Sequence, residues 1–221
     1  MWAARDRRYG GLHARYKTHR GGLARMLDPF SAESLDFKSP LHADNWHLRA
    51  FCPGVVECLN GVSGFNILEG GQVKDVVIDT FTRFKDGVQI ADMVVTKSTP
   101  SVERSWKVFQ QMGTVYRFTP FLRTRQEIRA NSVLLENLDL MRQHIVQHSH
   151  YFPIVVHHVL NILAGGATTK LKLSRDLAHC HHSDEVIDTV LFVLYRKNKV
   201  AINIAEVAYG LETKIALKNV S

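Results

Sequence analysis

The spacing of apolar side chains from residue 72 onward constrains the fold of this chain more than any other feature. Apolar residues recur there every three to four positions, as they do along one face of an amphipathic helix. In the segment VKDVVIDTFTRF, this face would carry Val73, Val76, Val77, Phe81 and Phe84. Because alternation of apolar and polar residues is nearly absent, the pattern predicts helices rather than strands.

Capping and proline signals divide this region into short segments. Helices are expected to begin at Pro100, at Thr119-Pro120, at Pro153 and after Ser183. A last helix is expected near the C-terminus, although VAINI (200–204) also fits a short strand. Together the segments amount to about eight short helices joined by short loops. The expected fold is therefore all-α, with short antiparallel helices in series, as in helical-repeat proteins.

The first 71 residues lack the helical spacing of apolar side chains that is seen from residue 72 onward. Residues 27–71 contain three prolines and scattered aromatic side chains, which predicts an irregular strap. Residues 1–26 are rich in arginine and glycine and lack the apolar surface that would order them. The expected organisation is a basic extended arm over 1–26, the strap over 27–71 and a helical domain over 72–221.

The positive charge of the chain is concentrated in the predicted arm. Residues 1–26 contain seven Lys or Arg residues and one acid, so they carry +6 of the formal net charge of +7. The remaining 195 residues carry only +1. Phosphate binding over a broad face needs many cations, so the nearly neutral body is excluded as a general nucleic-acid-binding surface.

Three interpretations of the basic segment compete. Its Arg-rich, acid-poor composition is typical of a mitochondrial transit peptide, but two pairs of glycines would break a continuous helix. A solvated tail is the second interpretation. In the third, guanidinium groups bind phosphates, and the interleaved Tyr and His rings stack on bases. We expect a retained arm that binds RNA through Arg5, Arg7, Arg8, Arg15, Lys17, Arg20 and Arg25.

Three helical segments open with a polar residue followed by Val, and they begin at residues 72, 101 and 132. The stretch that contains the second is ADMVVTKSTPSVERSWKVFQQM. It has a Val-Glu pair, then a small residue, then Val-Phe and a closing Met, at Val102, Glu103, Ser105, Val108, Phe109 and Met112. This stretch resembles one repeat of the pentatricopeptide family, with Trp106 in place of the usual small residue. Over about 65–145, the resemblance implies an organellar protein that binds RNA or serves as a scaffold. Unrelated amphipathic helices are the alternative.

The sequence offers few residues that could form an active site. A nucleophile elbow, a P-loop and a dinucleotide-binding motif are all missing from it. The three cysteines form no disulfide framework, which is typical of a reducing compartment. The richest segment in potential metal ligands is HCHHSDE, with His179, Cys180, His181 and His182. We interpret it as a polar loop before a capped helix, and we predict no catalytic residue, metal or cofactor.

These observations predict a non-enzymatic structural subunit of a large organellar ribonucleoprotein, on the matrix side of mitochondria. A mitochondrial ribosomal protein is the expected case, with RNA bound to the arm and several protein subunits around the body. The alternative is an accessory scaffold subunit of a mitochondrial respiratory or ATP synthase complex, with the arm on acidic protein or anionic lipid. No apolar run approaches the length of about 18 residues needed to span a bilayer.

Overall fold

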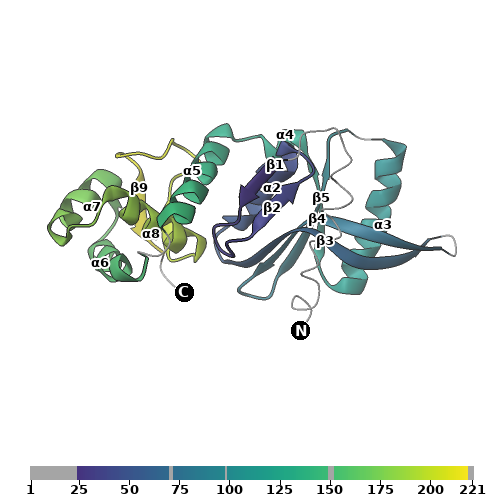
Figure 1. Cartoon of the computed structure of the whole chain (residues 1–221), viewed down its shortest axis with the longest axis horizontal. Helices are drawn as coiled ribbons and strands as arrows, with labels where there is room; N and C mark the ends of the chain where they lie inside the picture. The colour runs from purple at the N-terminus through teal and green to yellow at the C-terminus, as the bar shows by residue number, and fades with distance from the viewer. Residues whose placement is uncertain (1–23, 70–71, 98, 149–151, 219–221) are drawn as a thin grey trace. The chain divides into compact units, whose positions relative to one another are not determined.

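The computed structural model describes residues 24–69, 72–97, 99–148 and 152–218 (Figure 1). The chain divides into two compact units. The sheet unit comprises Leu35–Ala50 and Val55–Ala130 together with the segment that ends at Met26. The helical unit comprises Leu27–Ser34, Phe51–Gly54 and Asn131–Ser221. Each unit has its own sheet and its own buried residues, so they are described in turn.

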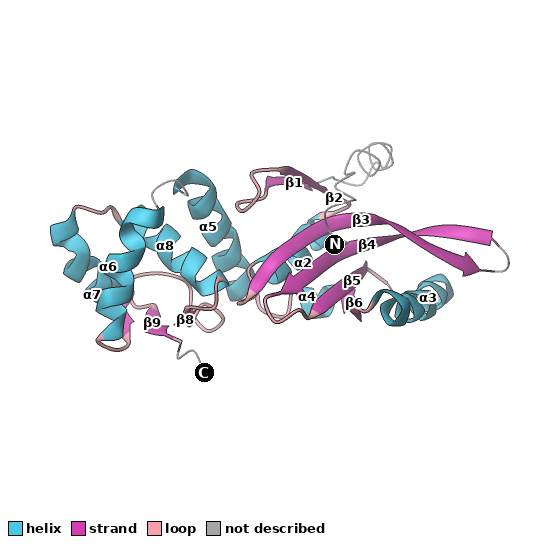
Figure 2. Cartoon of the chain, turned by 90° about the horizontal axis from the view of Figure 1, so that it is seen from below, coloured by secondary structure: helices cyan, strands magenta, loops and turns pink. Residues whose placement is uncertain are grey.

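The sheet unit is built around a four-stranded mixed sheet in the order β3-β4-β5-β6. Strands β3 to β5 form an antiparallel meander, whereas β6 lies parallel to β5 because helix α3 provides the crossover between them. Figure 2 shows β3 and β4 as a long, curved pair. The elements in chain order are α2 (Pro40–Ala50), β3 (Val55–Glu69), β4 (Gln72–Phe84), β5 (Gln89–Val95), α3 (Pro100–Tyr116), β6 (Thr119–Thr124) and α4 (Arg125–Ile128).

Helices α2 and α3 pack against different parts of this sheet. Ala91 lies in the core cluster that α3 forms with Phe109 and Met112, whereas Val94 lies in the cluster of Leu41 on α2. Successive residues of a strand point to opposite faces, so residues three apart on β5 face different helices. Asp92 and Val94 therefore point toward α2, and this alternation positions the candidate site described below.

A short hairpin precedes α2. Its strands, β1 (Ala24–Leu27) and β2 (Ser34–Phe37), form a separate two-stranded sheet. Asp28 stabilises the turn, since its carboxylate accepts hydrogen bonds from the Phe30 N–H and the Ser31 hydroxyl. Part of the segment that we expected to be an irregular strap is thus regular structure.

The helical unit contains four helices and a three-stranded sheet among its described residues. Helix α8 packs against both α5 and α6, and the sheet has the antiparallel order β7-β9-β8. Ser183 caps α8, because its hydroxyl accepts the Val186 N–H. The elements are α5 (Ser132–His148), α6 (Phe152–Ala164), β7 (Thr168–Thr169), α7 (Lys170–Leu177), the 3₁₀ turn η2 (Ala178–Cys180), α8 (Asp184–Arg196), β8 (Val200–Ile202) and β9 (Lys214–Leu217).

The all-α, helical-repeat prediction is wrong. The segment 72–84 forms strand β4, although its apolar residues also fit a helical period. Its composition of Val, Ile, Thr and Phe favours the pleated surface of a strand, because side chains branched at Cβ or bearing aromatic rings pack well there. The Gly70-Gly71 pair before this segment is also typical of a two-residue hairpin turn.

Two further segments that we expected to be helical contain strands. The stretch that begins at Thr119-Pro120 opens with strand β6 and becomes helical only from Arg125 onward, as α4 and α5. The expected C-terminal helix is absent, and strand β9 lies in that segment. The alternative for VAINI was the correct one, since β8 covers its first three residues. The helices expected after Pro100, near Pro153 and after Ser183 are present as α3, α6 and α8. Among the described residues, no helix combines the length and apolar character needed to cross a membrane.

Candidate functional site

Two buried aspartates lie on neighbouring strands of the sheet unit. Asp92 on β5 has no exposed surface, and Asp79 on β4 is 6% exposed. Strand pairing brings them close, because Thr80 and Asp92 are directly opposite each other in the ladder. A buried charge costs several kcal/mol unless it is paired and hydrogen-bonded. The partners of these two carboxylates therefore decide what the site can do.

Asp92 is held by side chains of α2. The Arg49 guanidinium donates from Nε to Oδ2 (2.7 Å) and from Nη2 to Oδ1 (2.6 Å), which is a bidentate ion pair. Asn45 Nδ2 donates to the same Oδ2 (2.9 Å) and also to the Thr80 hydroxyl (3.2 Å). Both carboxylate oxygens of Asp92 are thus engaged by the helix that covers them.

Asp79 is held from the start of α2 and from β5. The Lys38 ammonium donates to Oδ1, and the Val94 backbone N–H donates to Oδ2 (2.8 Å). His42 Nε2 lies 3.7 Å from the same Oδ1. Burial lowers the pKa of His42, and the Asp79 carboxylate opposes this effect only in part. The folded protein therefore binds a proton on His42 less readily than the unfolded chain does.

We call this group the α2 network. It consists of Lys38, His42, Asn45, Arg49, Asp79 and Asp92. His42, Asn45 and Arg49 are three and four residues apart, so they share one face of α2. This polar stripe is a signal that the sequence carries and that we did not recognise, since we expected no helix there.

The α2 network is arranged to hold α2 on the sheet rather than to bind a metal through its carboxylates. Paired carboxylates can hold divalent ions that promote hydrolysis, but only when their oxygens can reach the ion. Here both oxygens of each aspartate already accept hydrogen bonds from the chain. Arg123 adds a further cation, because its Nε donates to Asn45 Oδ1 (3.3 Å). The positive groups of the site therefore outnumber its carboxylates.

Six of the seven predicted RNA-binding residues lie outside the described residues: Arg5, Arg7, Arg8, Arg15, Lys17 and Arg20. The seventh, Arg25, is on β1, where its Nε lies 2.6 Å from Asp36 Oδ1 on β2. Hydrogen bonding and charge attraction from Asp36 raise the pKa of Arg25. Of its side-chain surface, 65% is exposed, so the ion pair with Asp36 lies at the surface.

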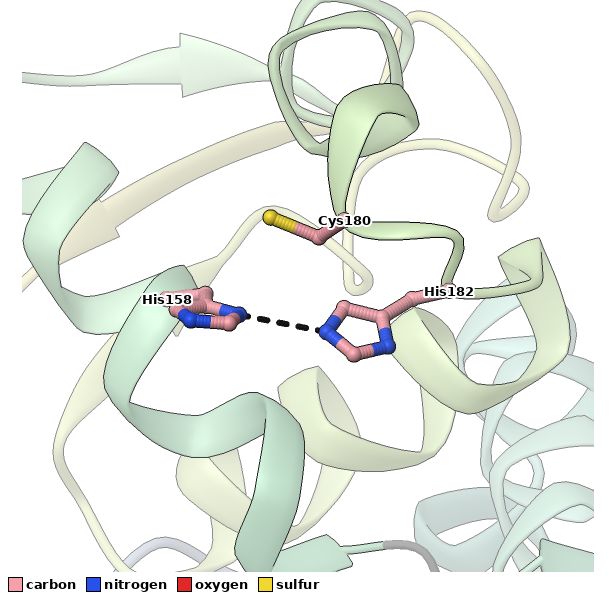
Figure 3. A group of neighbouring side chains, drawn as sticks. All are labelled: His158, Cys180 and His182. Carbon is pink, nitrogen blue, oxygen red and sulfur yellow. Dashed lines mark hydrogen bonds between the residues drawn. The ribbon is translucent and has the colours of Figure 1, made fainter.

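The histidine-rich segment lies before the Ser183-capped helix α8, as predicted, and two of its residues have a neighbour in α6. In the helical unit, Cys180 and His182 lie beside His158 of α6 (Figure 3). The possible ligand atoms of these three residues all lie within 4.8 Å of one another. His179 and His181, by contrast, are exposed. The sequence identified two members of this group, and only the fold could add the third.

In the helical unit, helices α7 and α8 are followed by the strands β8 and β9, an order that resembles a helix-turn-helix motif with a β-hairpin. In helix-turn-helix proteins, the second helix of such a pair enters the major groove of DNA. Here that helix is α8, which is largely buried against its neighbours from Ile187 to Leu194. Its first turn carries Asp184 and Glu185, which would repel phosphates. We therefore do not assign α8 a role in reading bases.

Comparison of the chain with protein-family models and with curated proteins finds no match. We therefore infer the function from the residues and their geometry.

Proposed function

We propose that this chain is a non-enzymatic subunit of a ribonucleoprotein assembly that binds RNA through its Arg-rich N-terminal segment. The observation that carries the proposal is the concentration of charge, with +6 of the net +7 in residues 1–26. RNA affinity depends mainly on cations that replace counterions along the phosphate backbone. A cationic segment attached to a nearly neutral body suits this task.

The α2 network supports the non-enzymatic part of the proposal. Its two buried carboxylates are occupied by Arg49, Asn45, Lys38 and a backbone amide. Ion pairs of this kind fix the position of a helix on a sheet. The sheet unit then serves as a platform for neighbouring subunits. Assignment to the mitochondrial ribosome, on the matrix side, stays a prediction from the sequence.

The test is the salt dependence of RNA binding, measured by fluorescence anisotropy with a labelled single-stranded RNA. Replacing Arg7, Arg8 and Arg15 by Gln removes three charges from the arm. The slope of log K against log salt is negative, and each lost phosphate contact should reduce its magnitude by about 0.7, so the total expected reduction is about 2. Affinity at low salt should also fall.

The matched control removes three charges from the body instead. Lys97, Arg104 and Lys107 are exposed near or on α3, and their replacement by Gln should leave the slope unchanged. Equal slopes for the arm variant and the wild type would contradict the proposal. Binding to anionic lipid vesicles but not to RNA would favour the accessory scaffold of a membrane complex instead.

A further inference from the structure

Two histidines and a cysteine from three different places in the helical unit lie close together. His158 is on α6, Cys180 ends the turn η2, and His182 lies just before Ser183, the cap of α8 (Figure 3). Nδ1 of His158 and Nε2 of His182 are 3.1 Å apart. We call these three residues the His₂Cys cluster.

The backbone between Cys180 and His182 brings both side chains to the same side. His181 adopts the left-handed conformation, with a φ of 57°, between the 3₁₀ turn and the start of α8. A non-glycine residue is uncommon there, because its Cβ crowds the backbone. Figure 3 shows the Cys180 sulfur and the His182 ring on the side of the turn that faces α6.

The distance between the two ring nitrogens of the cluster is close to that around a tetrahedral zinc ion. With Zn–N near 2.05 Å and Zn–S near 2.3 Å, tetrahedral geometry separates two nitrogens by about 3.3 Å and a nitrogen from a sulfur by about 3.6 Å. The two ring nitrogens are 3.1 Å apart, and all three ligand atoms lie within 4.8 Å. The two nitrogens thus match a tetrahedral site, and the sulfur lies near enough for a change of its side-chain torsion to complete the site.

The ligand types favour zinc over hard cations. Imidazole nitrogen and thiolate sulfur suit Zn²⁺, whereas Mg²⁺ and Ca²⁺ require oxygen ligands. A hydrogen bond between the two rings accounts for the histidines by themselves, but it gives no role to the thiol beside them. All three side chains are half-buried, so an ion can enter and still be partly shielded from water.

We propose that His158 Nδ1, Cys180 Sγ and His182 Nε2 bind a zinc ion. Within the described part of the chain, no fourth His, Cys, Asp or Glu joins the group. The remaining tetrahedral position goes to water or to an external ligand, as in zinc sites with three protein ligands. On binding, the Cys180 thiol releases its proton to solvent as the Zn–S bond forms. The ion links α6 to the turn between α7 and α8.

The proposal is tested with the full chain, stripped of metal and titrated with Co²⁺ and then Zn²⁺. Cobalt should bind at one ion per chain, with the absorption of a tetrahedral site and a thiolate-to-cobalt charge-transfer band. Zinc should displace it and raise Tm by about 5–11 °C at a hundredfold excess over Kd. Elemental analysis after dialysis gives the stoichiometry independently.

Variants separate this site from adventitious binding by the other histidines. Cys180→Ser should abolish the charge-transfer band, and His158→Gln or His182→Gln should weaken cobalt binding at least tenfold. The matched controls are Cys52→Ser and His157→Gln, which should bind as the wild type does. Circular dichroism of each metal-free variant checks that it is folded.

A charge-transfer band that survives Cys180→Ser would overturn the proposal. So would cobalt binding that is unchanged by loss of both His158 and His182, or that falls equally in the His157 control. If a variant at His158 fails to fold, the Cys180→Ser spectrum still decides the outcome.

Discussion

Single residues of the α2 network show how charge is kept inside the sheet unit. Asp92 is fully buried, and its cost is offset because Arg49 and Asn45 supply three hydrogen bonds from one helix face. Removing one partner of such a pair typically costs about 3–5 kcal/mol, since a buried charge then lacks compensation. The sequence signal for such a buried network is the polar stripe of His42, Asn45 and Arg49 on α2. A stripe of this kind looks the same in a sequence as a solvent-exposed helix face.

His42 should make the stability of the protein depend on pH. Burial lowers the pKa of His42 in the folded state, so the unfolded chain binds this proton more readily. Stability should therefore fall as the pH drops below about 6.5, the ordinary histidine value, and the loss should end below the folded-state pKa. Urea unfolding of the wild type and of His42→Gln between pH 7.5 and 5 measures this difference.

The control for this prediction is Ser39→Ala. It removes the hydroxyl that lies 2.8 Å from His42 Nδ1 but leaves the titrating ring in place. The pH-dependent loss should persist in this variant and should be smaller in His42→Gln. Parallel stability curves for His42→Gln and wild type across the range would contradict the assigned role of burial.

Among the secondary-structure elements, α3 shows how a local stop signal can be overridden. Glycine often ends a helix, but α3 continues past Gly113 to Tyr116, and Arg117 forms the left-handed cap. Gly113 is needed for another reason. A Cβ there would lie 2.8 Å from the Phe118 carbonyl oxygen and 2.9 Å from Pro120 Cδ. The glycine therefore allows the chain to return closely past the helix into β6.

Gly113→Ala should destabilise the sheet unit. The new methyl group meets backbone and a proline ring, neither of which can rotate away, and overpacking of this kind costs about 1–3 kcal/mol. Gly210→Ala is the control, because nothing lies within 4 Å of a Cβ at that position. Chemical denaturation should show a loss only for Gly113→Ala, and an equal effect of both substitutions would contradict the steric argument.

Across the chain as a whole, short pieces of the N-terminal region belong to the helical unit. Leu27–Ser34 and Phe51–Gly54 are grouped with Asn131–Ser221, far along the chain. The Phe30 ring has two close neighbours, the Phe51 ring with its centroid at 5.4 Å and the Arg196 guanidinium at 3.6 Å. The Gly54 N–H also donates to the Arg196 carbonyl (2.8 Å). The predicted strap is thus partly core.

Phe51→Ala should therefore destabilise the helical unit. Phe51 is 1% exposed, and truncation of a buried phenylalanine costs about 3–5 kcal/mol. Hydrogen exchange should show lost protection in α5 and α8, with a smaller change in β3 to β6. Val56→Ala is the control, since Val56 is 47% exposed. Loss of protection confined to the sheet unit would contradict the assignment of Phe51.

Features that depend only on residues close together in the sequence could be predicted from the sequence alone. The Ser183 cap, the proline near the start of α3 and the charge of residues 1–26 were all recognisable, because each acts over a few positions. The fold in three dimensions was needed to decide whether 72–84 became helix or strand, since β-structure is stabilised by partners elsewhere in the chain. It also placed His158 against His182, which are 24 residues apart. Such encounters depend on packing between elements, and no local pattern encodes them.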